Sequence, residues 1–294
     1  QLQAQQLMTA NEEQRQLNEY LEHQKNLISQ KNKYLTDSIK YAQIIQNSLL
    51  SSVETIKSVF ENSFIIYKPK DIVSGDFYYF EKLRREVDPE NNSILLIAAD
   101  CTGHGVPGAL LTMLGITLLN QIVVYERNSN PALILQKLND EINSMLVNKE
   151  HAERSGDGMD VAACKIDLNE SELTFCGAKR PLYLIQNNEF VEYHGNIHSI
   201  GGFYDNEVKN FDNQTIKLNK GDWIYMTSDG FVSQFGGDND KKFNRRRFRE
   251  LLLEIHQCDV KTQKSKIEEK FAHWKGNREQ VDDIMIIGFK YEPE

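Results

Sequence analysis

Four aspartates of this 294-residue sequence share one kind of position, at the point where an apolar run meets a glycine-containing turn. They are Asp76 in VSGDFYYF, Asp100 in ILLIAADCTGHG, Asp229 in WIYMTSDGF and Asp282 in QVDDIMIIGF. A carboxylate at the end of a buried strand is costly unless it is paired, hydrogen-bonded or bound to a metal ion. Each alone could equally form a turn or cap a helix. Four together favour a shared site, and all-oxygen ligands suit Mg²⁺ or Mn²⁺ better than Zn²⁺.

These carboxylates need strands to position them, and the sequence from about residue 63 onward contains short apolar, β-branched and aromatic runs typical of strands. The runs are Phe64–Tyr67, Ser93–Ala99, Asp160–Ile166, Leu182–Ile185, Trp223–Thr227 and Ile284–Phe289. Helical patterns lie between them, at Ala109–Tyr125, Pro131–Lys149, Arg247–His256 and Thr262–Trp274. Hairpin-like spacing between residues 160 and 193 favours antiparallel pairing. The sequence therefore predicts an α+β domain whose mixed or mainly antiparallel core is covered by helices.

The first sixty residues contain neither proline nor glycine and are rich in Gln, Glu, Lys, Asn and Leu, which predicts one long helix or two joined ones. One column repeats every seven residues, and all but one of its members are apolar: Leu7, Gln14, Leu21, Ile28, Leu35, Ala42 and Leu49. The companion column is mostly polar, so we expect residues 1–62 to form a weak parallel coiled-coil dimer. A single solvated helix, or one packed on the domain of residues 63–294, is the alternative.

Composition excludes several classes of protein. With 34 Lys and Arg against 43 Asp and Glu the net charge is −9, which argues against nucleic-acid binding. Four scattered cysteines without a CxxC pair indicate a reducing, cytoplasmic compartment. No signal peptide is recognisable, and polar residues interrupt Gly108–Tyr125, the nearest approach to a membrane span. The first residue is Gln and not Met, so we expect the full-length protein to have a sensor segment upstream. Attachment to a membrane through that upstream segment is left open.

Six segments occur in an order typical of one enzyme superfamily: KPKDIVSGDFYYF, LIAADCTGHGVPGALLTMLG, GMDVAACKID, AKRPLYLI, GDWIYMTSDGFVSQFGG and QVDDIMIIGF. Together they resemble the metal-dependent protein phosphatases (PPM, type 2C-like), in particular the bacterial SpoIIE-like serine/threonine branch. The resemblance covers about Ser63 to Tyr291, and KNKYLTDSIKYAQIIQNSLL before it resembles the linker helix of bacterial signalling proteins. It implies an αββα sandwich with two Mn²⁺ or Mg²⁺ ions at one end, preceded by a long N-terminal coiled-coil helix.

The resemblance also implies a role for each ligand. Asp100 would bridge both metals, Asp229 and Asp282 would complete one metal, and Asp76 with the backbone carbonyl of Cys101 would serve the other. Successive side chains of an extended segment point to opposite faces, so the Cys101 thiol should face away from the metals. Asp100 and Asp229 are the predicted catalytic residues. The metal pair would activate a bridging water for in-line attack on phosphorus, without a covalent phosphoenzyme.

Substrate contacts are less defined by the sequence. No clear counterpart of the phosphate-binding arginine of eukaryotic members is present, and the nearest cations by motif are Lys68, Lys70, Lys179 and Arg180. His104 lies four residues after Asp100 instead of two, so a general-acid role and a supporting role both stay open. Asp283 is a weaker candidate for a supporting or turn residue.

The predicted function is a phosphoserine/phosphothreonine protein phosphatase in bacterial signalling. The resemblance implies a small phosphorylated regulator as substrate, such as an anti-anti-sigma (STAS-type) protein. A homodimer through the N-terminal helix would transmit the signal of the upstream sensor. The alternative is a catalytically weak, phosphatase-like interaction module dimerised by the coiled coil. All four aspartates of the ligand set are present, which favours the enzyme.

Two further patterns have ordinary explanations. Gly103, Gly105 and Gly108 spell a G-x-G-x-x-G dinucleotide fingerprint, but Asp100 would repel a pyrophosphate. We expect these glycines to form a tight turn and close helix packing instead. A basic cluster is either a solvated loop and helix turn or a docking patch for an acidic partner. Its members are Lys241, Lys242, Arg245, Arg246, Arg247 and Arg249.

Overall fold

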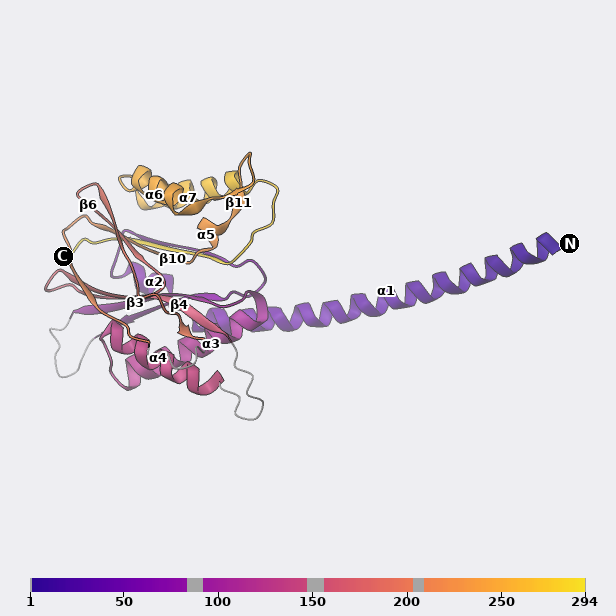
Figure 1. The fold of residues 1–294 in the computed structure, drawn as a ribbon, viewed down its shortest axis with the longest axis horizontal. Helices are drawn as coiled ribbons and strands as arrows, with labels where there is room; N and C mark the ends of the chain where they lie inside the picture. The colour runs from indigo at the N-terminus through magenta and orange to yellow at the C-terminus, as the bar shows by residue number, and fades with distance from the viewer. Residues whose placement is uncertain (1, 84–91, 147–155, 203–208, 294) are drawn as a thin grey trace. The chain divides into compact units, whose positions relative to one another are not determined.

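The computed structural model describes residues 2–83, 92–146, 156–202 and 209–293 (Figure 1). Contacts divide the chain into two units, residues 1–45 and 46–294. The first unit is part of one 48-residue helix, α1 (Leu2–Leu49), as the absence of helix breakers predicts. Leu21, Ile28 and Leu35 of the predicted seam are more than half exposed on it. These three positions of the seam are therefore uncovered, and the coiled-coil dimer stays a prediction.

The second unit is an αββα sandwich, as expected, with all named strand pairs antiparallel (Figure 1). One sheet has the order β1 (Ser63–Lys68), β13 (Ile284–Lys290), β10 (Trp223–Thr227), β6 (Leu182–Gln186) and β7 (Glu189–Tyr193). The other has the order β2 (Asp76–Lys82), β3 (Ser93–Cys101), β4 (Gly158–Asp167), β5 (Glu172–Ala178) and β9 (Gln214–Lys217), with β8 (Ile200–Gly201) beside β4.

Helices cover the outer face of each sheet. The β2–β3–β4–β5–β9 sheet carries α3 (Gly105–Asn120), the π-helix η1 (Gln121–Tyr125) and α4 (Pro131–Leu146). The other sheet carries α6 (Asn244–Ile255) and α7 (Val260–Lys275). Short elements complete the unit: α2 (Val53–Lys57), α5 (Gly230–Ser233), β11 (Phe235–Gly236) and β12 (Lys241–Lys242).

Alternation along the strands separates three apolar cores. In β3, Leu96 and Ala98 pack between the two sheets, whereas Ile97 and Ala99 pack against α3 and α4. The third core joins the other sheet to α6 and α7. Each fully buried aliphatic side chain contributes about 1.5–3 kcal/mol relative to its exposed state. The same alternation fixes the direction of the polar residues at the end of β3.

All six predicted strands and all four predicted helices are present; the strand over Trp223–Thr227 has the predicted ends, and the others have ends shifted by a few residues. The helix expected over Ala109–Tyr125 begins at Gly105, and its last turn is π-helical. The last three residues of the helix expected over Pro131–Lys149 lie outside the described residues. The helix over Gly105–Tyr125 is, in the described part of the chain, long and apolar enough to cross a membrane, but 56% of that apolar window is buried inside the domain. Such burial is typical of the core helix that the sequence predicts.

Candidate functional site

Three aspartates face one another across neighbouring strands. The register places Asp76 of β2 opposite Asp100 of β3, and Asp100 opposite Asp160 of β4. In each strand the aspartate alternates in phase with residues of the core between the sheets, such as Tyr78 and Ala98. All three therefore point toward the opposite sheet. Directly opposed like charges destabilise a sheet, so this row requires nearby positive charge.

The opposite sheet contributes carboxylates from the loops at the ends of its strands. Asp229 follows β10 and begins α5, and Asp282 and Asp283 immediately precede β13. The backbone N–H of Asp229 lies 3.4 Å from Oδ2 of Asp100, although 129 residues separate them. The fold thus gathers the predicted aspartates from both sheets at one end of the sandwich.

Burial dominates the electrostatics of this group. It raises the pKa of Asp100 to about 7, where Arg180 lowers the value and Asp229 and Asp282 raise it. Burial, followed by the charge of Asp100, holds the pKa of Asp76 well above its usual range. Asp76 is 2% exposed, and its Oδ2 has no hydrogen-bond partner. A divalent cation is the kind of ligand that such an orphaned carboxylate oxygen accepts.

A guanidinium lies at the centre of the group. Arg180 contacts Asp100 directly, and its Nη2 lies 3.7 Å from Oδ2 of Asp160 and 3.8 Å from Oδ1 of Asp229. In the described part of the chain, no three His, Cys, Asp or Glu side chains are arranged to hold an ion. The donor types and the orphaned Asp76 oxygen fit divalent ions, but the arrangement requires Arg180 to move aside. The ligand set Asp76, Asp100, Cys101, Asp229 and Asp282 stays a prediction.

Cys101 follows the alternation predicted for it. Its side chain is buried in the core on the helix side, with Sγ 3.7 Å from Oγ1 of Thr112. Burial raises the pKa of the thiol well above its usual range, so the sulfur stays protonated. The Cys101 N–H donates to the carbonyl of Gly75 at 3.1 Å, which ties the end of β3 to the segment before Asp76. The Cys101 thiol therefore faces away from the site, as predicted, and the carbonyl as a ligand stays a prediction.

Asp283 fixes the loop that leads to Asp76. Its two carboxylate oxygens accept hydrogen bonds from the backbone N–H groups of Lys70 and Gly75, both at 2.7 Å. The side chain is 3% exposed. Hydrogen bonds from backbone N–H groups to a charged, buried acceptor are among the strong ones in proteins. The sequence left a supporting role and a turn role open for Asp283, and this geometry gives it a supporting position.

Gln46 holds the same segment from another side, and the sequence gave no sign of it. Its Nε2 donates to the carbonyl of Ser74 at 2.6 Å, and its Oε1 accepts from the Ser74 N–H at 3.1 Å. Gln46 is 1% exposed, in a helix whose other glutamines are mainly solvated. Because Ser74 lies two residues before Asp76, this amide clamp positions the start of β2.

We expect Gln46→Ala to lower the free energy of unfolding by about 1–3 kcal/mol, because it leaves buried backbone groups of Ser74 without their amide partner. Urea unfolding followed by circular dichroism measures the change. Asn47→Ala is the matched control, since Asn47 is exposed on the same turn and should change stability by less than about 0.5 kcal/mol. Equal stabilities of the two variants would show that the clamp contributes nothing.

The four candidate substrate cations occupy different surroundings. Lys68 pairs with Glu268 of α7 at 3.3 Å, and Lys179 lies 4.0 Å from Asp160. Nζ of Lys70 lies 2.9 Å from Nε2 of His104, whose Nδ1 lies 2.8 Å from Asp71. This Lys70–His104–Asp71 cluster is exposed at the start of α3. Of the four cations, Arg180 alone is buried among the aspartates, with 11% of its side chain exposed.

The glycines of the apparent dinucleotide fingerprint have the packing role expected of them. Gly103 and Gly105 have φ angles of 84° and 69°, which favour glycine. Gly108 of α3 packs directly against the Gly103 carbonyl and the Gly75 Cα. The turn after Asp100 and the segment before Asp76 therefore lie against the start of α3.

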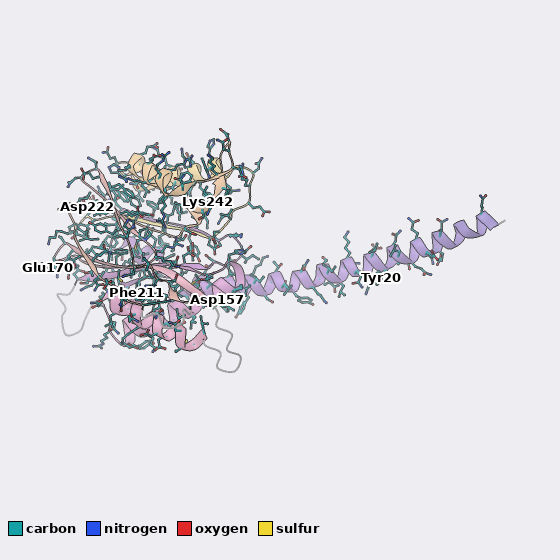
Figure 2. All side chains as sticks on the ribbon, viewed as in Figure 1. Tyr20, Asp157, Glu170, Phe211, Asp222 and Lys242 are labelled. Atoms are coloured by element: carbon teal, nitrogen blue, oxygen red, sulfur yellow. The ribbon has the colours of Figure 1, made fainter. Side chains whose placement is uncertain are left out.

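The basic cluster is partly used for packing. The guanidinium of Arg247 lies 4.7 Å from the ring centre of Trp274, and that of Arg249 lies 5.0 Å from the ring centre of Phe190. Figure 2 places Lys242, on β12, at the same end of the domain as Asp157, next to the start of β4, whereas Glu170 and Asp222 lie at the other end. Lys242 thus lies toward the carboxylate end, whereas Arg249, over Phe190, lies toward the other end, and a docking role stays a prediction.

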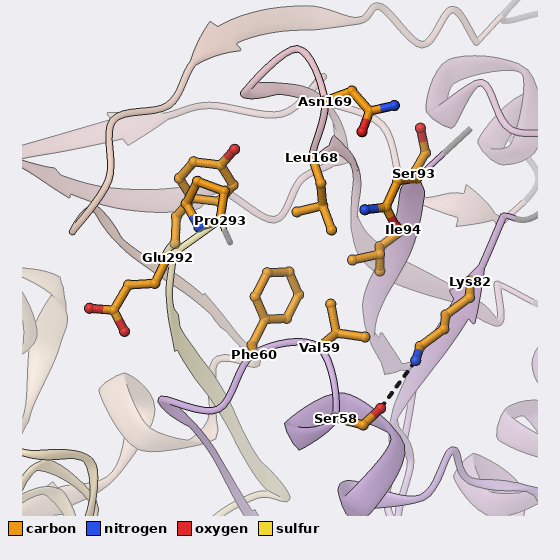
Figure 3. Close-up of a pocket in the computed structure, with 12 residues that line it drawn as sticks. Ser58, Val59, Phe60, Lys82, Ser93, Ile94, Leu168, Asn169, Glu292 and Pro293 are labelled. Carbon is orange, nitrogen blue, oxygen red and sulfur yellow. Dashed lines mark hydrogen bonds between the residues drawn. The ribbon is translucent and has the colours of Figure 1, made fainter. Parts of the chain in front are cut away.

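A cavity of about 330 Å³ lies away from the aspartates (Figure 3). Its lining includes Phe60, Lys82, Ser93 and Ile94, at the ends of β2 and β3 opposite to Asp76 and Asp100. Lys82 lies six residue steps along β2 from Asp76, a span of about 20 Å. Lys82 donates to Oγ of Ser58 across the cavity edge at 3.1 Å. This cavity is therefore separate from the carboxylate site.

Comparisons with known proteins agree with this architecture. The family model of stage II sporulation protein E (SpoIIE) matches residues 90–292. The SiaA-PP2C domain of Pseudomonas aeruginosa is 32% identical with a TM-score of 0.77, over 89% of this chain and 98% of that one. No curated protein sequence matches significantly.

Two more distant structures share the fold. One is SpoIIE from Bacillus subtilis, whose structure contains the PP2C phosphatase domain and a fragment of the regulatory domain. It is 16% identical with a TM-score of 0.60, over 78% of this chain and 63% of that one. RsbX in complex with magnesium is 14% identical with a TM-score of 0.51, over 78% of this chain and 94% of that one.

Proposed function

This chain belongs to the SpoIIE family of PP2C-type phosphatases, and on that premise we propose that it hydrolyses phosphoserine or phosphothreonine in a protein with the help of two divalent cations. One observation carries the proposal. Carboxylates from both sheets converge at one end of the sandwich, and Asp76 offers a buried oxygen without a partner. Magnesium is bound by the related RsbX, which supports Mg²⁺ or Mn²⁺ as the ion.

The residues divide the work between ion binding and loop positioning. Asp76, Asp100, Asp229, Asp282 and the Cys101 carbonyl would hold the ions. Bound divalent cations supply an activated water and offset negative charge on the phosphoryl oxygens. The side chains of Gln46 and Asp283 hydrogen-bond to the backbone of Ser74 and Gly75 and so hold the segment before Asp76 in place. The ligands therefore stay fixed while negative charge develops on the phosphoryl group.

Phosphate release with and without metal tests the proposal. We expect hydrolysis of p-nitrophenyl phosphate and of a phosphoserine protein in Mn²⁺, loss of that activity in EDTA, and recovery when Mn²⁺ is added back. Equal rates in all three conditions would contradict a metal-dependent enzyme. The alternative is a catalytically weak interaction module, and the position of Arg180 among the predicted ligands is the observation that supports it. This alternative predicts that the protein binds Mn²⁺ but hydrolyses little substrate.

We also propose that the substrate is a small phosphorylated regulator protein and that α1 pairs two copies of the chain. The relatives include domains of bacterial regulatory systems, which supports the first part. The exposed Leu21, Ile28 and Leu35 support the second, because a coiled coil would cover them. Light scattering measures the mass in solution, and a value near the 34.0 kDa of one chain would contradict pairing.

A further inference from the structure

Arg180 occupies a fixed place on the backbone. It follows β5 after Lys179, whose φ of 59° turns the chain, and its N–H donates to the Ala178 carbonyl at 2.7 Å. Its carbonyl packs closely against Gly177 and Gly195, where a Cβ would not fit. The backbone therefore cannot move far, and any change in the position of the guanidinium must come from rotation of the side chain.

The guanidinium is an incomplete counter-ion for its surroundings. One guanidinium faces Asp100, Asp160 and Asp229, with Lys179 as a further cation 4.0 Å from Asp160, and Asp76 stands opposite Asp100 in the sheet. Arg180 Nε is buried without a hydrogen-bond partner, like Oδ2 of Asp76. Unpaired buried polar atoms destabilise a structure, so this arrangement is open to replacement by ions that satisfy more oxygens.

Asp160 offers the guanidinium a second partner. It lies 3.7 Å from Nη2 of Arg180, and Oγ of Ser199 donates to its other oxygen at 2.6 Å. Asp160 is outside the predicted ligand set, although it pairs in register with Asp100. A small rotation would take Arg180 from Asp100 to Asp160 without exposing its charge.

We propose that Arg180 is a displaceable counter-ion that neutralises Asp100 when no metal is bound and transfers to Asp160 when ions bind. The inference rests on the metal binding of the proposed function. Arg180 then weakens metal affinity and stabilises the metal-free protein, and Asp160 acts as a positioning residue for Arg180. Competition between Arg180 and the ions for Asp100 sets a minimum metal concentration, below which Arg180 stays paired with Asp100 and the ions do not bind.

Mn²⁺ binding measured by calorimetry, without any substrate, tests the proposal. We expect Arg180→Gln to lower the Mn²⁺ dissociation constant by about tenfold and to lower the melting temperature in EDTA by about 5 °C or more. Lys220→Gln, which removes an exposed cation from the turn between β9 and β10, is the matched control and should change affinity by less than about twofold. Binding by the parent chain with unchanged or weaker binding by Arg180→Gln overturns the inference and leaves the proposed function standing.

A double-mutant cycle separates the role of Asp160 from direct ligation. Asp160→Asn should weaken Mn²⁺ binding in the parent chain, because Arg180 then has only Asp100 and Asp229 to contact. The same substitution should have no effect in the Arg180→Gln background. Equal weakening in both backgrounds would make Asp160 a metal ligand and overturn its proposed role. Absence of Mn²⁺ binding in every variant would overturn both this inference and the metal-dependent function.

Discussion

Asp100→Asn should reduce kcat/KM by about a thousandfold, equivalent to about 4 kcal/mol of transition-state stabilisation. Asp100 is the only predicted ligand that contacts groups from three directions. It stands opposite Asp76 and Asp160 in the sheet. Its carboxylate forms an ion pair with Arg180 and accepts a hydrogen bond from the Asp229 N–H. An amide of the same shape keeps the packing but removes the charge that would bridge two cations. The loss should appear mainly in kcat, with Mn²⁺ binding weakened in parallel.

The fold should survive this substitution, because it removes one charge from a crowded group of carboxylates. Circular dichroism and thermal unfolding in EDTA verify that. Asp37→Asn is a matched control, since it makes the same chemical change at an exposed position of α1 and should leave the rate unchanged. Retention of more than about a tenth of the parent rate by Asp100→Asn, with the same response to Mn²⁺, would contradict a bridging role.

Six of the strands, and the polar residues at their ends, were predictable because both depend on local pattern. A continuous apolar run predicted β3, and the alternation of side-chain direction along a strand placed Asp100 between the sheets and the Cys101 thiol on the helix side. β2 was not predicted as a strand, although Asp76 at its start was singled out. Like the run of β3, its aromatic run is buried on both faces without a period of two, but it is only four residues long and is flanked by Asp76 and Glu81. Pattern thus identifies a residue at an element boundary more readily than it identifies the element.

Residues that act through register or tertiary contact were not predictable in the same way. Asp160 was part of a recognised segment, but its position next to Asp100 depends on the register between β3 and β4, which the sequence alone does not show. Gln46 is one of many glutamines in α1, and only the folded domain shows that its amide is buried on Ser74. Among the basic candidates, sequence spacing gave no reason to prefer Arg180 to Lys68 or Lys70. Burial among carboxylates distinguishes it.

Gly108→Ala should damage the site from the helix side, with at least about a hundredfold loss of activity and a loss of stability of about 1–3 kcal/mol. The added Cβ would meet the Gly103 carbonyl oxygen well inside van der Waals contact and the Gly75 Cα at 2.9 Å. Both neighbours are backbone atoms, which cannot rotate away. The substitution would therefore push the turn after Asp100 apart from the segment that carries Asp76.

Helix propensity alone predicts that Gly108→Ala raises stability instead of lowering it, so the sign of the measured stability change distinguishes the two effects. Alanine stabilises a helix interior by about 1 kcal/mol relative to glycine, so Gly108→Ala would be stabilising if close packing were unimportant. Gly156→Ala is the matched control, because a Cβ there meets no atom of the described residues within 4 Å. Leu110→Ala tests the exposed face of the same helix, where the side chain is 61% exposed. If Gly108→Ala were as active and as stable as these two variants, the contact between α3 and the two ligand segments would have no part in holding the carboxylates together.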